Sequence, residues 1–406
     1  MNGSDRFLHI LSRIVFSILT FASVFVISFP RDAIALELPD RTFLNLSLEF
    51  LDEYELPKMT YEGTKVGGLS AITYDPKSYN ADSHSFKMYA LSDDSGYIND
   101  PRFYTLEVKL KSPEQGKIGI DNVRVEGVTF LKNEKGETFP PQFLNPEGIA
   151  LSPRNSLFIS SEGISDVGVT ALMLGEFDLK TGQLQEKFPI PTRYLPDAEG
   201  DKQTRGIVNN LGLESLTLDR ESFSPGGRDP FRLFTAVESP LIQDKDTREG
   251  RNRFLHYLIV DKEPKLVAEH FYPLDRVSSL FQGLTDLLSL GKGGHFLSLE
   301  RSFGFKGFEA KIFQVAIAGA TDTSRIESLK GELNTVKPMA KKLLLDFHQL
   351  DIAIDNLEGM TLGPRLADGS QSLILVSDDN FRPEQKNQFI LLRVKSNSRS
   401  ASEKEI

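Results

Sequence analysis

Acidic residues border short apolar runs in a spacing that would let carboxylates act together. In residues 145–163, NPEGIALSPRNSLFISSEG, Glu147 precedes one apolar run and Glu162 follows the next. The intervening Ser-Pro-Arg-Asn favours a turn, because proline fixes φ and the Ser and Asn side chains hydrogen-bond nearby backbone groups. The segment therefore predicts a β-hairpin with two carboxylates at its open end.

This hairpin pattern occurs five times in the chain. The first apolar runs follow Gly67-Gly68, Glu147, Glu214, Gln282 and Glu358, and the second runs end at Asp93-Asp94, Glu162, Glu238, Glu300 and Asp378-Asp379. The copies begin 67 to 80 residues apart. Repetition of strand pairs at such intervals is typical of a propeller or a solenoid.

The repeats predict where the carboxylates lie. In a propeller blade the innermost strand begins, and the antiparallel second strand ends, at the same face, so the acids of all five copies should meet at one mouth of the central channel. Crowded carboxylates raise one another's pKa unless a cation intervenes. Oxygen ligands in irregular geometry suit Ca²⁺ better than Mg²⁺. The alternative is that the acids accept hydrogen bonds from turn amides or tie blades together.

The predicted metal ligands are the acids of the first strands, Glu147, Glu214 and Glu358. Only three of the five copies have an acid there, whereas all five have one at the end of the second strand, which is more typical of a structural role. A carboxylate-bound metal would polarise a phosphoryl or acyl oxygen and lower the pKa of a bound water. Asp378 or Asp379 would then act on that water, and Arg301 would bind the anionic group of the substrate through its guanidinium. Arg102 and Arg382 also follow second strands, and for all three arginines a salt bridge to the carboxylates is the competing interpretation.

The rest of each repeat supplies further strands. Runs such as FYTLEVKL, ALMLGEFDL, FLHYLIVD and KIFQVAIA give each copy enough chain for a four-stranded sheet. The sequence therefore predicts an all-β fold, a β-propeller with long inter-strand loops. Five repeats are visible and five to seven blades are expected, because a sixth could be hidden in the long excursions or completed by FLNLSLEF (43–50). A short helix is expected within 326–350, and a β-sandwich is the alternative fold.

The first 35 residues resemble a secretory signal peptide. Arg6 and Arg13 precede an apolar stretch, and Ala33-Ile34-Ala35 has the small-x-small pattern of a cleavage site. Cleavage after Ala35 would leave residues 36–406 as one secreted or periplasmic domain, and N-terminal sequencing of the mature protein would test it. An uncleaved anchor is the alternative, although a span usually needs roughly 20 apolar residues.

Composition narrows the partners. The net charge of −10 disfavours nucleic acid and anionic membrane as partners and is compatible with cation binding. The chain has no cysteine, so neither disulfides nor thiolate chemistry is available. We expect a monomer that, once the signal is removed, does not associate with membranes.

The hairpins NPEGIAL…LFISSEG, LGLESLTL…LFTAVESPLIQD, FLSLERSFG and NLEGMTL…LILVSDDNF resemble those of the phytase-like domain family, also described as esterase-like activity of phytase. The similarity runs from about Gly67 to Val394. It implies an exported propeller and suggests hydrolysis of phosphate or carboxylic esters. Neither the Arg-His-Gly-x-Arg-x-Pro motif nor the Asp-Asp-Pro-Ala motif of two other phytase classes is present.

Three functions remain open from the sequence. The first is a metal-dependent hydrolase of phosphate or carboxylic esters, which are small-molecule substrates. The second is a non-catalytic propeller, stabilised by calcium, that binds a sugar, a peptide or an envelope partner. The third, a lactonase or sugar dehydrogenase, has the least support. A fold alone does not distinguish them.

Overall fold

β-Strands make up almost all of the regular structure. The computed structural model describes residues 42–112, 116–163, 172–197, 203–219, 230–246, 249–260, 263–277 and 279–396. The proposed signal peptide and its cleavage site lie outside these residues. The described part contains short 3₁₀ turns but no α-helix. Nor does it contain a helix with the length and hydrophobicity that a membrane span requires.

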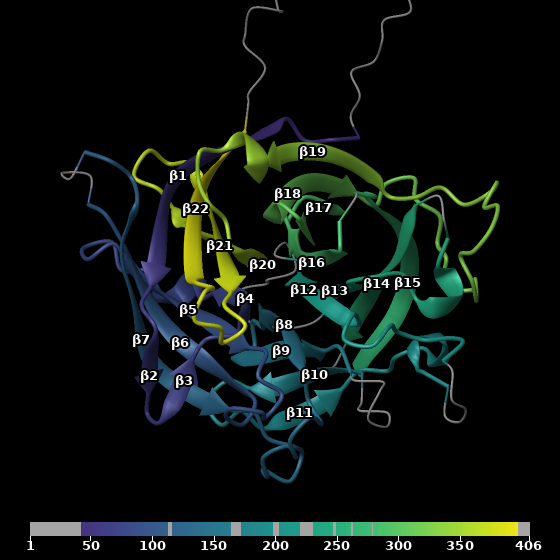
Figure 1. Cartoon of the computed structure of the whole chain (residues 1–406), viewed down its shortest axis with the longest axis horizontal. Helices are drawn as coiled ribbons and strands as arrows, with labels where there is room; N and C mark the ends of the chain where they lie inside the picture. Colours follow the sequence, from purple (N-terminus) through teal and green to yellow (C-terminus); the bar gives the residue numbers. More distant parts are fainter. Residues whose placement is uncertain are drawn as a thin grey trace, which may run out of the picture. The chain divides into compact units, whose positions relative to one another are not determined.

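Five four-stranded antiparallel sheets surround a central axis, as the blades of a β-propeller (Figure 1). Blade 1 contains β4 (Leu69–Tyr74), β5 (Ser85–Ser92), β6 (Arg102–Leu110) and β7 (Ile120–Phe130). Blade 2 contains β8 (Pro146–Leu151), β9 (Ser156–Ser161), β10 (Met173–Asp178) and β11 (Leu184–Lys187). Blade 3 contains β12 (Leu213–Leu218), β13 (Phe231–Val237), β14 (Gly250–Val260) and β15 (Glu263–Leu274). Blade 4 contains β16 (Phe281–Ser289), β17 (His295–Gly304), β18 (Gly307–Ala316) and β19 (Ala340–Asp346).

Blade 5 closes the ring with strands from both ends of the described chain. Its inner strands are β20 (Asn356–Arg365), β21 (Gln371–Asp378) and β22 (Asn387–Ser396), and its outer strand is β1 (Leu46–Leu56). In the antiparallel register, Leu46 is opposite Ser396 and Leu56 is opposite Asn387. The segment FLNLSLEF thus completes the fifth blade, not a sixth. The described residues form five blades, the lower end of the expected range; β2 (Met59–Tyr61) and β3 (Thr64–Val66) form a separate hairpin.

The helix expected within 326–350 is not formed. Pro338 interrupts the segment just before β19, the outer strand of blade 4. One 3₁₀ turn, Phe347–Gln349, follows β19 and is capped by the carboxylate of Asp346. Residues 340–346 pair with β18 as the fourth strand of blade 4. This pairing satisfies backbone hydrogen-bonding groups that a helix interrupted by Pro338 would leave without partners.

The hydrophobic core is divided among the gaps between neighbouring blades. Five clusters of buried apolar side chains lie between blades 1 and 2, 2 and 3, 3 and 4, 4 and 5, and 5 and 1. The innermost strands also contact one another around the axis in the order β4, β8, β12, β16, β20 and back to β4. Each inner strand is buried on both faces, which fixes where its side chains point.

Three threonines link the inner strands of neighbouring blades. Thr73 Oγ1 accepts a hydrogen bond from Leu151 N at 3.2 Å, and Thr361 Oγ1 accepts one from Tyr74 N at 3.2 Å. Thr217 Oγ1 accepts from Ser289 N at 2.9 Å. Each hydroxyl satisfies a backbone amide of the adjacent blade.

We therefore expect Thr217→Val to lower the free energy of unfolding by about 1–3 kcal/mol, because the amide of Ser289 would stay buried without an acceptor. Thr235→Val is the matched control in the same blade. Thr235 is fully buried, and its hydroxyl has no hydrogen-bond partner within the described part of the chain. Denaturant unfolding should show a loss for Thr217→Val and none for Thr235→Val. Equal losses would show that the interblade hydrogen bond contributes nothing beyond packing.

Candidate functional site

A β-bulge near the start of each inner strand sets the direction of the candidate ligands. The pairing register with the second strand shifts across Ser70, Glu147-Gly148, Glu214, Thr285 and Glu358. A bulge bends the strand locally and changes the direction of a side chain. The three first-strand glutamates therefore share one structural position, and the equivalent residues of blades 1 and 4 are Ser70 and Thr285. Gly67 and Gln282, which the repeat comparison aligned with the glutamates, lie three residues earlier.

A second ring of positions lies at the ends of the second strands. The residues that pair just before each bulge are Ser92, Ser161, Val237, Glu300 and Ser377, so the residues that follow them are equivalent: Asp93, Glu162, Glu238, Arg301 and Asp378. Four blades place an acid at this position. Blade 4 places Arg301 there instead.

The expected location of Glu300 at the mouth is wrong. Successive side chains of a strand point to opposite faces, so a shift of one residue directs Glu300 away from the channel. Its carboxylate accepts hydrogen bonds from Tyr272 Oη and Lys341 Nζ, both at 2.6 Å. Glu300 therefore links strands of blades 3 and 4.

The remaining carboxylates line one cavity of about 580 Å³. Seven acids contribute to it: Asp93, Glu147, Glu162, Glu214, Glu238, Glu358 and Asp378. The lining also includes two arginines, Arg301 and Arg382, amide side chains such as Asn210 and Asn356, and an apolar wall of Leu280, Phe281 and Phe303. The structure thus brings together, at one mouth, acids that lie far apart in the sequence. The roles assigned to them as metal ligands or catalytic groups stay predictions.

Arg301 neutralises one side of this mouth. Its guanidinium donates to Glu238 Oε1 at 2.7 Å and to Glu358 Oε1 at 2.5 Å, and its side chain is only 16% exposed. A third hydrogen bond joins it to Asn356 Oδ1 at 2.6 Å. Arg301 therefore connects blades 3, 4 and 5, and its donors are directed at protein carboxylates.

Three carboxylates on the other side of the mouth are close enough to share a cation. Glu147, Glu162 and Glu214 each offer an oxygen, and these oxygens lie within 4.8 Å of one another. Calcium binds oxygens at about 2.3–2.6 Å, so ligands on opposite sides of the ion are roughly 5 Å apart. Glu214 is 7% exposed, and its Oε2 has no hydrogen-bond partner in the described residues. Glu358, the third ligand predicted from the sequence, is bound to Arg301 instead of joining this group.

Burial and mutual repulsion hold protons on the cluster. Burial raises the pKa of Glu162 to about 8, the neighbouring Glu238 adds to the rise, and hydrogen bonds, including one with Glu147, oppose it. Burial also raises the pKa of Asp378 to about 7. The pKa values of Glu147 and Glu214 lie well above the usual range because the two groups are buried next to other carboxylates. Burial and mutual repulsion thus favour the protonated form of these carboxyl groups, and a bound cation would favour the ionised form.

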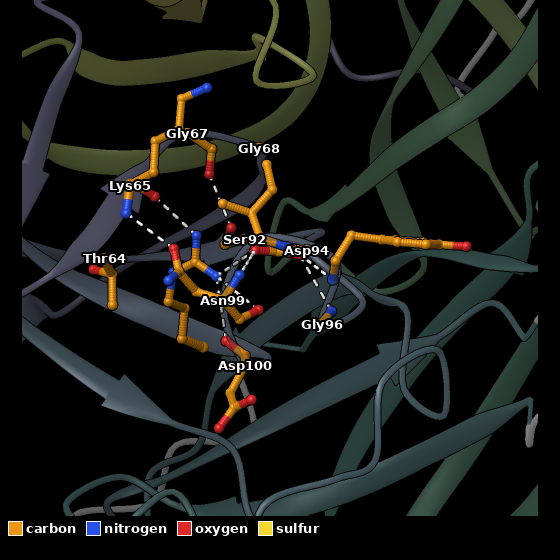
Figure 2. Close-up of polar contacts among 12 residues, drawn as sticks. Thr64, Lys65, Gly67, Gly68, Ser92, Asp94, Gly96, Asn99 and Asp100 are labelled. Atoms are coloured by element: carbon orange, nitrogen blue, oxygen red, sulfur yellow. Dashed lines mark hydrogen bonds and ion pairs between the residues drawn. The ribbon is translucent and has the colours of Figure 1, made fainter.

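Asp94 and Arg102 form a buried ion pair next to the loop that follows β5. Figure 2 shows Asp94 with its neighbours Gly96 and Asn99 in this loop. The Asp94 carboxylate accepts hydrogen bonds from the amides of residues 96–99, and from Arg102 Nη1 at 2.9 Å. Arg102 is fully buried and also donates to Lys65 O at 2.8 Å. Its guanidinium therefore holds the loop after β5 in place, which agrees with the salt-bridge interpretation of this arginine.

Asp379 occupies the position in blade 5 that corresponds to Asp94. Its carboxylate accepts from Gly68 N at 2.8 Å and from Lys58 Nζ at 2.5 Å, and it is fully buried. It does not line the cavity, whereas the adjacent Asp378 does. Of the two candidate catalytic aspartates, only Asp378 faces the mouth.

The opposite mouth of the channel has different chemistry. Its cavity, of about 690 Å³, is larger and is lined mainly by apolar residues at the far ends of the inner strands, such as Tyr74, Leu151, Leu218 and Leu288. Of these two cavities, only the acidic one is lined by titratable groups whose pKa values are strongly shifted. Such groups are common at functional sites, so we expect chemistry at the acidic mouth.

Three residues that line the cavity, Asp93, Glu162 and Asn356, are not among the ligands or catalytic groups predicted from the sequence. Asn356 Nδ2 donates to Glu358 Oε1 at 2.8 Å and to Asp378 Oδ2 at 3.3 Å. The acidic ends of the second strands, present in every copy, were the available signal for Glu162 and Asp93. For Asn356 we find no signal in the sequence.

Comparisons with solved structures give distant similarities. The catalytic domain of a GH62 alpha-L-arabinofuranosidase from Coprinopsis cinerea is 7% identical, with a TM-score of 0.40, and the match covers 87% of this chain and 98% of that chain. A putative glycoside hydrolase from Bacteroides ovatus is 12% identical, with a TM-score of 0.35 and coverage of 88% and 95%. The search of curated proteins found no match.

The family comparison is direct. Residues 64–381 match the phytase-like family, described as "Esterase-like activity of phytase". The match begins at β3, includes the inner strands of all five blades and ends just after Asp378 and Asp379. The chain belongs to the phytase-like family.

Proposed function

We propose that the protein is an exported, metal-dependent hydrolase of phosphate or carboxylic esters that acts at the acidic mouth. The observation that carries the proposal is the group of Glu147, Glu162 and Glu214, whose oxygens lie within 4.8 Å of one another. The buried Oε2 of Glu214, which has no hydrogen-bond partner among the residues that the structure describes, is a second reason to expect a cation there. Family membership supports ester hydrolysis as the reaction class.

Calcium is the proposed ion, since it accepts carboxylate oxygens in irregular geometry. When bound, it would polarise the oxygen of a phosphoryl or acyl group and lower the pKa of a coordinated water. Asp378 is the proposed proton acceptor because it lines the same cavity. Its pKa of about 7 matches the requirement that a general base have a pKa near the working pH. The apolar wall of Leu280, Phe281 and Phe303 would contact the organic part of the ester.

We expect the purified protein to hydrolyse para-nitrophenyl phosphate or para-nitrophenyl acetate with calcium and to lose this activity in the metal-free form. Asp378→Asn should lower kcat by about 10²–10⁴-fold, the usual contribution of a general base, with calcium affinity nearly unchanged. Asp379→Asn is the neighbouring comparison, because its carboxylate lies outside the cavity. A larger loss of kcat in Asp379→Asn than in Asp378→Asn would contradict the assignment.

The competing function predicts a different result. A non-catalytic propeller that uses calcium for stability would bind the ion at the same carboxylates and hydrolyse neither ester. Calcium binding without turnover across a panel of phosphate and acyl esters would therefore favour a binding protein over a hydrolase.

A further inference from the structure

The sequence predicts Arg301 as the cation that binds an anionic substrate, and two more arginines, Arg102 and Arg382, also follow second strands. Two of the three are already engaged: Arg102 is paired with Asp94, and Arg301 is paired with Glu238 and Glu358. Arg382 is different. It lines the acidic cavity and is exposed, and within the described residues its side chain makes no ion pair or hydrogen bond.

A strained turn holds Arg382 at the rim of the cavity. Asn380 and Phe381, which precede it, both adopt positive φ, 45° and 53°, in the left-handed region that non-glycine residues avoid. Two aspartates support the turn: Asp378 Oδ1 accepts from Asn380 N at 2.6 Å, and Asp379 Oδ1 accepts from Phe381 N at 3.1 Å. Backbone strain persists only where the surroundings enforce it, and it clusters at functional sites.

The rest of the turn is fixed as well. Lys58 Nζ donates to Arg382 O at 2.8 Å, and Arg382 N donates to Asp379 O at 2.8 Å. The Phe381 ring lies 5.5 Å from Lys65 Nζ and 5.8 Å from Arg102 Cζ. The backbone of Arg382 is thus anchored while its guanidinium has no partner in the described part of the chain, which is the arrangement that a preorganised binding residue requires.

We propose that Arg382 binds the anionic group of the substrate, so that the enzyme prefers phosphate monoesters to uncharged esters. This inference rests on the proposed function. A guanidinium forms paired hydrogen bonds with two oxygens of a phosphate group. A calcium ion at the proposed site would offset part of the negative charge of the seven carboxylates, as Arg301 does, and Arg382 adds a further positive charge to the lining of the cavity.

Binding of inorganic phosphate tests the proposal without requiring turnover. By titration calorimetry on the calcium-loaded protein, Arg382→Ala should weaken phosphate binding by about tenfold or more, the loss expected for a charge-assisted hydrogen bond. Arg382→Lys should give an intermediate affinity, because an ammonium group cannot form the paired contact. Arg232→Ala is the matched control. Arg232 is an exposed arginine near the start of β13, the end of that strand away from the acidic mouth.

Kinetics provide the second measurement. Arg382→Ala should lower kcat/KM for para-nitrophenyl phosphate by about tenfold more than for para-nitrophenyl acetate, since only the phosphate ester offers the guanidinium an anion. Unchanged phosphate affinity in Arg382→Ala, or a wild-type protein that binds no phosphate, would overturn the proposal. Loss of phosphate affinity in a protein that hydrolyses no ester would support Arg382 as an anion-binding residue and reject the hydrolase.

Discussion

Arg301→Met is expected to lower the free energy of unfolding at neutral pH by about 3–5 kcal/mol, the usual effect of removing one member of a buried ion pair. The substitution leaves Glu238 and Glu358 without their counter-charge at 3% and 7% exposure. Both carboxyl groups already have pKa values above the usual range because of burial, and Arg301 opposes this rise. Denaturant unfolding measures the loss, with Arg232→Met as an exposed-arginine control.

Two further results would show that the loss is electrostatic. Changing Glu238 and Glu358 to Gln in the Arg301→Met background should restore most of the stability, because the uncompensated charges are removed together with their partner. The loss should also be smaller in acid, where the two carboxyl groups accept protons. A triple variant no more stable than Arg301→Met would indicate that Arg301 acts through packing and not through charge.

Calcium is expected to stabilise the native protein, and the stabilisation should grow as the pH rises from about 4.5 to about 8. Without metal, Glu162 holds its proton up to about pH 8 in the folded state but only to about 4.5 when unfolded. The folded state then binds more protons than the unfolded state, so the stability of the metal-free protein falls across this range. Calcium binds the ionised carboxylates and replaces those protons. At a free concentration of 100 times its Kd, it adds about 2.7 kcal/mol.

Thermal unfolding of metal-free and calcium-loaded protein across this pH range provides the measurement. Glu162→Gln should reduce the calcium effect and raise the stability of the metal-free protein at pH 8, because it removes one of the repelling carboxylates. Glu358→Gln is the informative comparison, since the sequence predicted Glu358 as a ligand and the structure pairs it with Arg301. If Glu358→Gln abolishes the calcium effect and Glu162→Gln does not, the ligand set predicted from the sequence is correct. Identical melting curves with and without calcium would exclude both sets.

The five-fold repeat, and the end of each hairpin at which its acids lie, can be predicted from the sequence alone. In an antiparallel hairpin, the start of one strand and the end of the next are adjacent whatever the rest of the chain does. That local rule, applied to five copies, was sufficient to predict a propeller and to bring Glu147, Glu214, Glu358 and Asp378 to one mouth. The all-β class followed from the same repeats.

Which of two adjacent residues at the end of a second strand faces the channel depends on how the strands pair in the folded protein. Strand side chains alternate between two faces, so one residue of register separates Arg301 from Glu300 and Asp378 from Asp379. The bulges that set this register form only when the second strand is paired. They place Ser70 and Thr285 at the positions in blades 1 and 4 that are equivalent to those of the three glutamates.

Long-range pairing decided the rest. The fifth blade is completed by β1, whose partner β22 lies at the other end of the described chain, and no local pattern links the two segments. The pairing of Arg301 with Glu238 and Glu358, which leaves Glu162 with Glu147 and Glu214, likewise joins residues from different blades. Sequence periodicity predicts only that the strand ends carrying most of these acids meet at one mouth. Which of them are neutralised by an arginine and which are free to bind a cation depends on distances that exist only after the ring has closed.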